Sequence, residues 1–207
     1  MHELDCTLPG DHEAKLLYLM DYPTARDKNL SIAWLQQRKF ANDNKKKAYQ
    51  QDLYKIVKAF VERLVARPEF PPDVVLVPPS GSRLFDPYLN KLREVSPDLV
   101  VVDGLFAKAE GYAAGVDGQK FDDVLAAITL TAELPQSVAG AGHVLILDDI
   151  YNTGNTAGAM ITRVRPSMAA QPQVVVACVL SVPLEPKVDW EALMREMESA
   201  PDEGTEG

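Results

Sequence analysis

The stretch VLILDDIYNTGNTAG, residues 144–158, decides the fold. Its first four residues, Val144 to Leu147, are apolar and typical of a parallel strand that is buried on both faces. Two carboxylates, Asp148 and Asp149, come at the end of this strand, and a short Thr/Asn/Gly turn follows them. The run after the turn is compatible with a helix. This order predicts a strand, a polar site and a helix N-terminus in an open α/β sheet.

The residue types in this stretch suit a phosphorylated sugar. Ligands of an open α/β sheet bind beyond the carboxyl ends of the strands, so Asp148 and Asp149 are expected at the rim of a crevice. There they could hold vicinal hydroxyls or a hydrated Mg²⁺. The turn offers backbone N–H groups and hydroxyls at the positive end of the next helix, which suits a phosphate. Its residues are Asn152, Thr153, Gly154, Asn155 and Thr156.

The same stretch closely resembles the 5-phosphoribosyl-1-pyrophosphate (PRPP) binding motif of the type I phosphoribosyltransferases. Every position from Val144 to Thr156 fits that motif except Asn152, which replaces the usual Thr, Ser or Asp. The resemblance implies that Asp148 and Asp149 act as catalytic residues facing the ribose hydroxyls, and that residues 152–156 wrap the 5-phosphate. It also implies Mg²⁺ as cofactor, held through PRPP and water near the two acids without a direct protein ligand.

Two other segments match the layout of this family. Residues 73–77 (DVVLV) predict a buried strand, and the loop PPSGSR follows it directly. This loop resembles the family's pyrophosphate loop, and its binding residues would be Ser80, Gly81, Ser82 and Arg83. Glycines interrupt any regular period from Gly104 to Phe121, which is typical of a functional lid or of an idle surface loop. The family's flexible catalytic loop lies at this place and would carry Lys108 and Lys120.

The remaining pattern predicts one α/β domain with a mostly parallel sheet and helices on both faces. A long amphipathic helix of period 3.6 is expected over residues 45–67. Residues 1–14 carry no periodicity apart from a turn at Pro9-Gly10, and residues 129–141 are ambiguous. Strands are expected near residues 74–78, 99–103, 144–148 and 174–180, and shorter helices near residues 86–95, 121–128 and 157–164.

The chain is expected to divide into an extension, a core and a tail. Residues 45–182 would form the phosphoribosyltransferase-like core. Residues 1–44 are either a hood that contacts the base, by analogy with the family, or simply part of the core through Tyr18 and Trp34. Residues 183–207 predict one helix followed by an acidic tail that is too polar to order itself.

Composition excludes several classes of protein. A net charge of −9 over 207 residues provides no excess of Lys and Arg for broad nucleic-acid binding. The two cysteines, Cys6 and Cys178, support neither a disulfide framework nor a Cys-based metal site. No apolar run is long enough to span a membrane, and the acidic N-terminus is unlike a secretory signal. A cytoplasmic protein without membrane contact is therefore expected.

The expected function is transfer of the phosphoribosyl group from PRPP to an unidentified nitrogenous base, with release of pyrophosphate. Such a pentosyltransferase belongs to nucleotide metabolism, and its partners are PRPP and the base, with a homodimer left open. One alternative is a PRPP- or nucleotide-sensing regulator that keeps the binding loop without turnover. The other is a receiver-like signalling domain that uses the acid pair for Mg²⁺, but it leaves the T-G-x-T turn unexplained.

Overall fold

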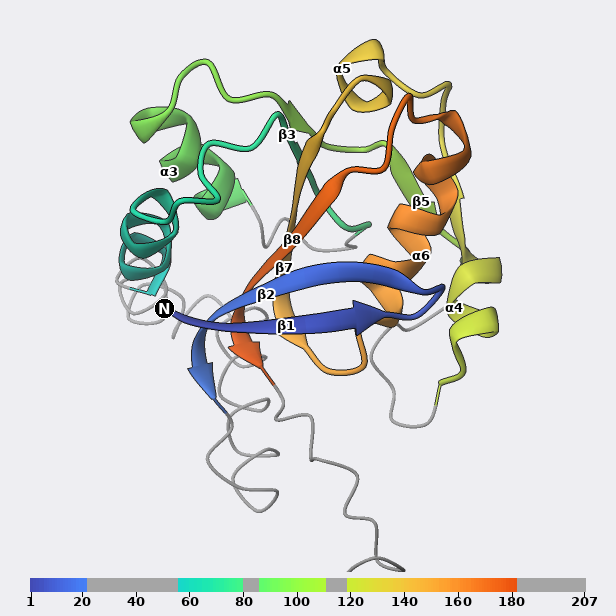
Figure 1. Ribbon diagram of the computed structural model, residues 1–207, viewed down its shortest axis with the longest axis horizontal. Helices are drawn as coiled ribbons and strands as arrows, with labels where there is room; N and C mark the ends of the chain where they lie inside the picture. Colours follow the sequence, from blue (N-terminus) through green and yellow to red (C-terminus); the bar gives the residue numbers. More distant parts are fainter. Residues whose placement is uncertain (22–55, 80–85, 111–118, 182–207) are drawn as a thin grey trace, which may run out of the picture.

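The computed structural model describes residues 1–21, 56–79, 86–110 and 119–181. Within these ranges the chain forms an α/β fold on a six-stranded sheet with the strand order β1-β2-β8-β7-β3-β4 (Figure 1). β1 (His2–Leu8) and β2 (His12–Asp21) pair antiparallel, whereas the other neighbours in this sheet pair parallel. The sheet is therefore mixed and mostly parallel, which confirms the predicted α/β class with a mostly parallel sheet.

The inner parallel strands lie where the sequence predicts them. β3 (Val74–Leu76), β7 (His143–Tyr151) and β8 (Gln173–Ser181) are apolar runs buried on both faces, and β4 (Val101–Val102) is a short edge strand. Asp73 fixes β3 against β7, because its Oδ2 accepts the N–H groups of Gly142 and His143 at 2.8 and 2.9 Å. These hydrogen bonds therefore fix the register of β3 and β7 at their amino ends.

Helices cover both faces of the sheet. α6 (Asn155–Val164) and α4 (Phe121–Ala127) pack on the face of Val144 and Ile146, together with the short α5 (Gln136–Ala139). Leu145 and Leu147 point to the opposite face, which α3 (Asp86–Val95) and the helical residues 56–65 cover. A 3₁₀ turn, η1 (Arg165–Ser167), leaves α6. The two layers of helices appear on either side of the sheet in Figure 1.

The N-terminal residues differ from the expectation. Residues 1–14 lie mostly in the β1–β2 hairpin, whose turn is closed by positive φ angles at Gly10 (89°) and Asp11 (60°). The strand escaped prediction because β1 is an edge strand, exposed at most positions, and shows no hydrophobic alternation. Of the helix predicted over residues 45–67, residues 56–65 are helical, and its expected start lies outside the described residues.

The stretch predicted to be irregular from Gly104 contains a strand. β5 (Phe106–Lys108) pairs antiparallel with β6 (Ile128–Leu130), which lies in the segment that the sequence left ambiguous. Thr131 Oγ1 donates to the Gly104 carbonyl at 2.7 Å and extends this attachment. Two strands of three residues each are too short to produce a readable period.

A buried carboxylate joins the hairpin to the turn that follows residue 65. Glu69, whose side chain is 7% exposed, accepts from Lys15 Nζ of β2 at 2.6 Å and from Arg67 Nε at 3.2 Å. Arg67 also pairs with Glu3 of β1. Burial by itself would raise the pKa of Glu69, but the hydrogen bonds from Lys15, from its own backbone amide and from Arg67 lower it to about 2. The charged form of Glu69 therefore stabilises the folded state.

We expect Glu69→Gln to lower the free energy of unfolding at pH 7 by about 2–3 kcal/mol, as follows from a pKa that folding lowers from 4.5 to about 2. A lowered carboxyl pKa contributes stability above the unfolded value of 4.5, and this contribution is lost as the pH falls from 4.5 toward 2. Urea unfolding of parent and variant at several pH values measures the difference, which should shrink on acidification.

Glu62→Gln is the matched control for this experiment. Glu62 pairs with Lys58 at 3.7 Å, but both side chains are more than half exposed, so its loss should have a negligible effect. A Glu69→Gln difference that is equally large at pH 7 and at pH 2 would contradict the assigned role of the Glu69 charge.

Candidate functional site

The carboxyl ends of the parallel strands form one edge of the sheet, and some of the predicted site residues lie there. β3 and β7 are in register with Val74 opposite Val144 and Leu76 opposite Ile146. Two residues further along each strand come Pro78 and Asp148. The loop that begins with Pro78 and the acid pair of β7 therefore start from neighbouring strands at the same edge.

β7 continues through the acid pair to Tyr151, three residues beyond the strand end that the sequence predicted near residue 148. β7 remains paired with β8 through Asp148 opposite Cys178 and Tyr151 opposite Ser181. On its other side, β3 has already ended at Leu76. The half-buried Asp148 thus stands beside a step in the sheet, on the side of β3. The side chain of Asp149 lies outside the described residues.

The turn after β7 has the form of an anion-binding turn. Gly154 is buried, has φ of 73° and is the N-cap of α6. The first N–H groups of a helix have no intrahelical acceptors, and at the positive end of α6 these are the N–H groups of residues 154–157. Thr153 accepts from the Asn155 N–H through Oγ1, at a long 3.4 Å, while Asn152 and Thr156 are half-buried. The predicted phosphate residues therefore surround one helix N-terminus.

Asn155 makes a hydrogen bond to a distant segment that the sequence did not predict. Its side-chain Nδ2 donates to the Gln119 carbonyl at 3.0 Å, so this amide holds the chain just before α4 against the start of α6. Arg163, near the other end of α6, donates to the carbonyls of Leu125 and Ile128 at 2.5 and 2.9 Å. α4 is therefore fixed to α6 at both ends, and residues 119 and 120 start from the edge of the candidate site.

A pocket of about 310 Å³ lies beside this edge, at the carboxyl ends of β3 and β4. Lys108 of β5 is half-buried and lines it, so one of the two predicted catalytic lysines faces the start of the predicted pyrophosphate loop. Its walls are Pro78, Pro79, Asp103, Gly104, Phe106, Ala107 and Lys108. Ser80, Gly81, Ser82 and Arg83 lie outside the described residues.

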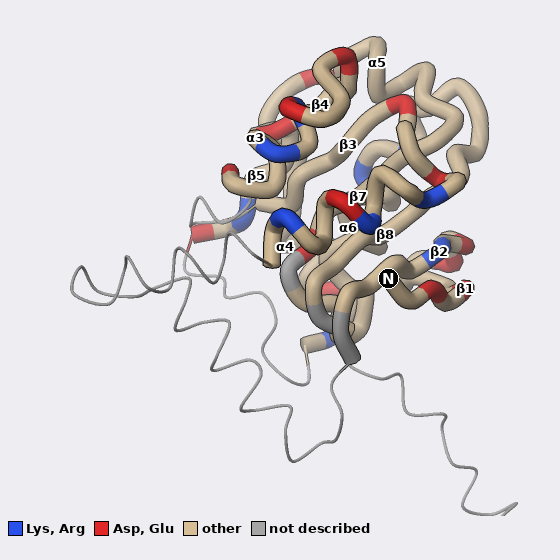
Figure 2. The backbone as a smooth tube through the Cα atoms, turned by 90° about the vertical axis from the view of Figure 1, so that its left-hand side faces the viewer, with Lys and Arg blue, Asp and Glu red and all other residues tan. Residues whose placement is uncertain are grey.

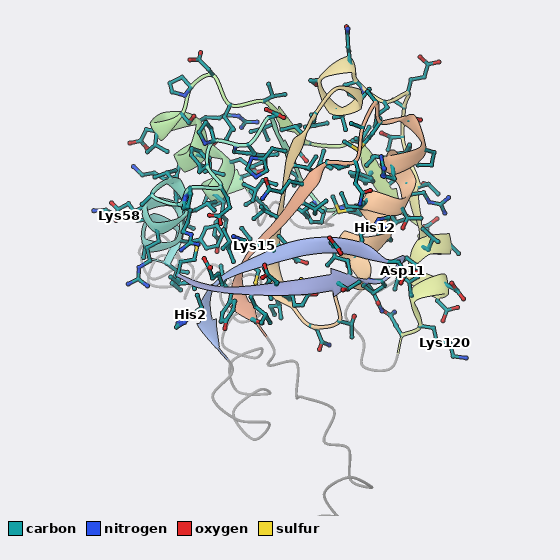
Figure 3. All side chains as sticks on the ribbon, viewed as in Figure 1. His2, Asp11, His12, Lys15, Lys58 and Lys120 are labelled. Atoms are coloured by element: carbon teal, nitrogen blue, oxygen red, sulfur yellow. The ribbon has the colours of Figure 1, made fainter. Side chains whose placement is uncertain are left out.

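The structure does not bring the second predicted lysine to this pocket. Lys120 precedes α4, is exposed and points away from the sheet in Figure 3. Lys108 and Lys120 therefore have different surroundings, although the sequence assigned both to one loop.

A carboxylate at this edge is chemically suited to hold a hydrated Mg²⁺. Among the described residues, no three His, Cys, Asp or Glu side chains cluster as a metal site. Mg²⁺ in phosphoryl and pyrophosphoryl sites keeps several waters and takes one or two carboxylates together with substrate oxygens. Asp148 places one such carboxylate at this edge.

Charge and hydropathy of the described chain add little to the choice of function. Lys and Arg alternate with Asp and Glu along the tube in the view of Figure 2. Within the described ranges, no helix is both long and apolar enough to cross a membrane. Comparison with models of protein families and with curated proteins found no match for this chain. The functional assignment therefore depends on the motif and on the geometry of the sheet edge.

Sequence reasoning did not predict that the β1–β2 hairpin packs against the turn at Gly154. Leu8 of β1 and the hydroxyl of Tyr151 both lie under Gly154, within 3.1 Å of the position that a Cβ atom would take there. In the sequence, Tyr151 occupies a position of the motif that is mostly apolar, and nothing else there indicated a role for it. No local pattern could have indicated that residues 6–9 lie beside it.

Proposed function

We propose that the protein is a phosphoribosyltransferase of the type I kind, which binds PRPP and transfers its phosphoribosyl group to a nitrogenous base in the cytoplasm. The observation that carries the proposal is the placement of the motif: Asp148 lies on a central parallel strand, and the turn at Gly154 opens the helix after it. Acids and anion-binding amides then lie at one sheet edge, a few residues apart, as a ribose 5-phosphate requires.

Each part of the edge has a role in this proposal. Asp148 and Asp149 accept hydrogen bonds from the ribose hydroxyls, and the amides and hydroxyls of residues 152–156 bind the 5-phosphate. Lys108 and residues 80–83 bind the pyrophosphate, since Lys108 lines the pocket beside Pro78 and Pro79. Mg²⁺ would supply charge neutralisation of the pyrophosphate oxygens when bound.

The chemistry follows from the charges that develop. Breaking the bond between ribose C1 and the pyrophosphate oxygen leaves the electron pair on pyrophosphate and positive charge on the sugar ring. A lone pair of the base nitrogen then forms the new bond to C1, and the nitrogen loses its proton to solvent. Fixed cations and amides stabilise the leaving group, and the two carboxylates hold the ring and offset part of its charge.

Calorimetry with Mg²⁺-PRPP, followed by assays of pyrophosphate release over purines, pyrimidines and small aromatic amines, tests the proposal. We expect saturable PRPP binding and release of pyrophosphate with at least one base. Binding without release for any base would instead favour the PRPP-sensing regulator. An absence of binding to PRPP and to ribose 5-phosphate would contradict both.

We expect Lys108→Met to lower kcat/KM for PRPP by about tenfold or more, because it removes the cation that stabilises the leaving pyrophosphate. Lys120→Met is the matched control, since it makes the same change at an exposed position directed away from the sheet. Its kcat/KM should stay within about twofold of the parent value. Equal effects of the two substitutions would contradict the separate role of Lys108. Steady-state pyrophosphate release at varied PRPP concentration measures both.

A further inference from the structure

Tyr151 lies directly beneath the candidate phosphate turn. Its side chain is 2% exposed, and its O–H donates to Cys6 Sγ of β1 at 3.8 Å. A Cβ atom at Gly154 would lie 2.7 Å from the Tyr151 hydroxyl oxygen and 3.1 Å from Leu8 Cδ2. The turn at Gly154 therefore packs against the Tyr151 hydroxyl of β7 and against Leu8 at the end of β1.

Burial raises the pKa of Tyr151 far above the physiological range, so the hydroxyl stays protonated and acts as a donor. Burial also raises the pKa of Cys6, and the hydrogen bond from Tyr151 only partly opposes this. Both groups are therefore neutral at pH 7. The contact beneath the turn is a packing contact with a weak hydrogen bond, and it adds no charge near an anion.

The hairpin that carries Cys6 and Leu8 is fixed to α6 by its turn. A Cβ atom at Gly158 would lie 2.4 Å from the Pro9 carbonyl oxygen, so α6 and the hairpin turn meet with no space for a side chain. His12 Nε2 and Thr162 Oγ1 form a hydrogen bond of 2.9 Å on the next turn of the helix, and Figure 3 shows His12 beside α6. The support beneath Gly154 is therefore held in place along the length of α6.

We propose that Tyr151 is a positioning residue of the anion site, and that the β1–β2 hairpin is a structural part of that site. The proposal rests on the proposed function, because the anion is taken to be the 5-phosphate of PRPP. Tyr151 is 2% exposed, so its role would be to position the turn and not to contact the substrate. It acts by fixing the position and the φ angle of Gly154. These two determine the direction of the N–H groups of residues 154–157.

This role has a defined kinetic signature. The 5-phosphate is remote from the reacting C1 atom and binds alike in the ground state and in the transition state. Loss of its positioning should therefore raise the KM for PRPP and leave kcat unchanged. A general loss of folded protein would instead lower the apparent kcat and leave KM unchanged.

Tyr151→Phe tests the proposal with the least change, because it removes only the hydroxyl. We expect the dissociation constant for ribose 5-phosphate, measured by calorimetry, to rise about three- to tenfold. Tyr88→Phe is the matched control, since Tyr88 is 3% exposed but lies on α3 and packs on the opposite face of the sheet. Its dissociation constant should equal the parent value even if its melting temperature falls as far as that of Tyr151→Phe.

A double-variant cycle tests the contact itself. In the parent, Gly154→Ala forces the turn away from the Tyr151 hydroxyl and should weaken ribose 5-phosphate binding by about 30-fold. In the Tyr151→Phe background the new methyl group meets less obstruction, so the same change should weaken binding by only about threefold. The positive φ of Gly154 is common to both backgrounds and cancels in the comparison.

The two failures are distinguishable. If the parent binds ribose 5-phosphate and Tyr151→Phe binds it equally well, or if Gly154→Ala has the same effect in both backgrounds, the positioning role is wrong and the proposed function stands. If the parent binds neither ribose 5-phosphate nor PRPP, the proposed function is wrong and the positioning role is refuted with it.

Discussion

Asp148→Asn is expected to lower kcat/KM for PRPP by about tenfold to a thousandfold, because it removes a charge-assisted hydrogen bond from a partly closed site. Asp148 is half-buried on β7, opposite Cys178, so an amide of the same shape fits the position and the fold should survive. Pyrophosphate release at varied PRPP concentration measures the loss, and the melting temperature of the variant checks that it is folded.

Asp98→Asn is the control for this substitution. Asp98 is exposed and precedes β4, at the amino edge of the sheet and away from the candidate site. The same chemical change should there leave kcat/KM within about twofold of the parent. If Asp148→Asn turns over PRPP as fast as Asp98→Asn does, Asp148 does not hold the ribose.

Gly154→Val is expected to weaken ribose 5-phosphate binding by at least about 100-fold and to destabilise the fold by about 2–4 kcal/mol. Two physical causes add. The φ of 73° is unfavourable for a β-branched residue, and its Cβ atom would lie 2.7 Å from the Tyr151 hydroxyl. Calorimetric titration and urea unfolding measure the two effects separately.

Gly104 separates the two causes. It has a similar φ of 77°, but a Cβ atom placed on it would have no neighbour within 4 Å. Gly104→Ala should therefore show only the strain of the backbone angle, about 1–2 kcal/mol, whereas Gly154→Ala should show that strain and the steric clash. Equal unfolding free energies for the two alanine variants would mean that Gly154 is not in close contact with its surroundings.

The central part of the fold was predictable because its strands are buried on both faces. β3, β7 and β8 appear in the sequence as uninterrupted apolar runs, and no surface requirement disturbs that pattern. The edge strand β1 gave no such signal, since only Leu8 of its seven residues is buried. β5 and β6 pair with each other, and each is too short for its sequence to show the period of a strand.

The candidate site was predictable only where its residues are adjacent in the sequence. Asp148 and the turn at Gly154 form one motif, and β7 and α6 place them at the expected edge. Lys108 lines the pocket at that edge, where the pairing of β5 with β6 holds it, whereas Lys120 does not line that pocket. Tyr151 and Leu8 pack beneath Gly154 through a contact between segments that are distant in the sequence. Neither residue type indicates such a contact in the sequence.

The parallel pairing of β2 with β8 has a consequence for the order of folding. Ala14 lies opposite Val174, so this pairing closes one of the longest loops that the chain can form, and such contacts form slowly. During synthesis the hairpin emerges early, but it cannot join the sheet until β8 has left the ribosome. The anion turn lies between them in the sequence and rests on the hairpin. If the proposed function holds, a nascent chain that has already exposed its T-G-x-T turn cannot yet bind the sugar phosphate, because the hairpin beneath the turn is not yet part of the sheet.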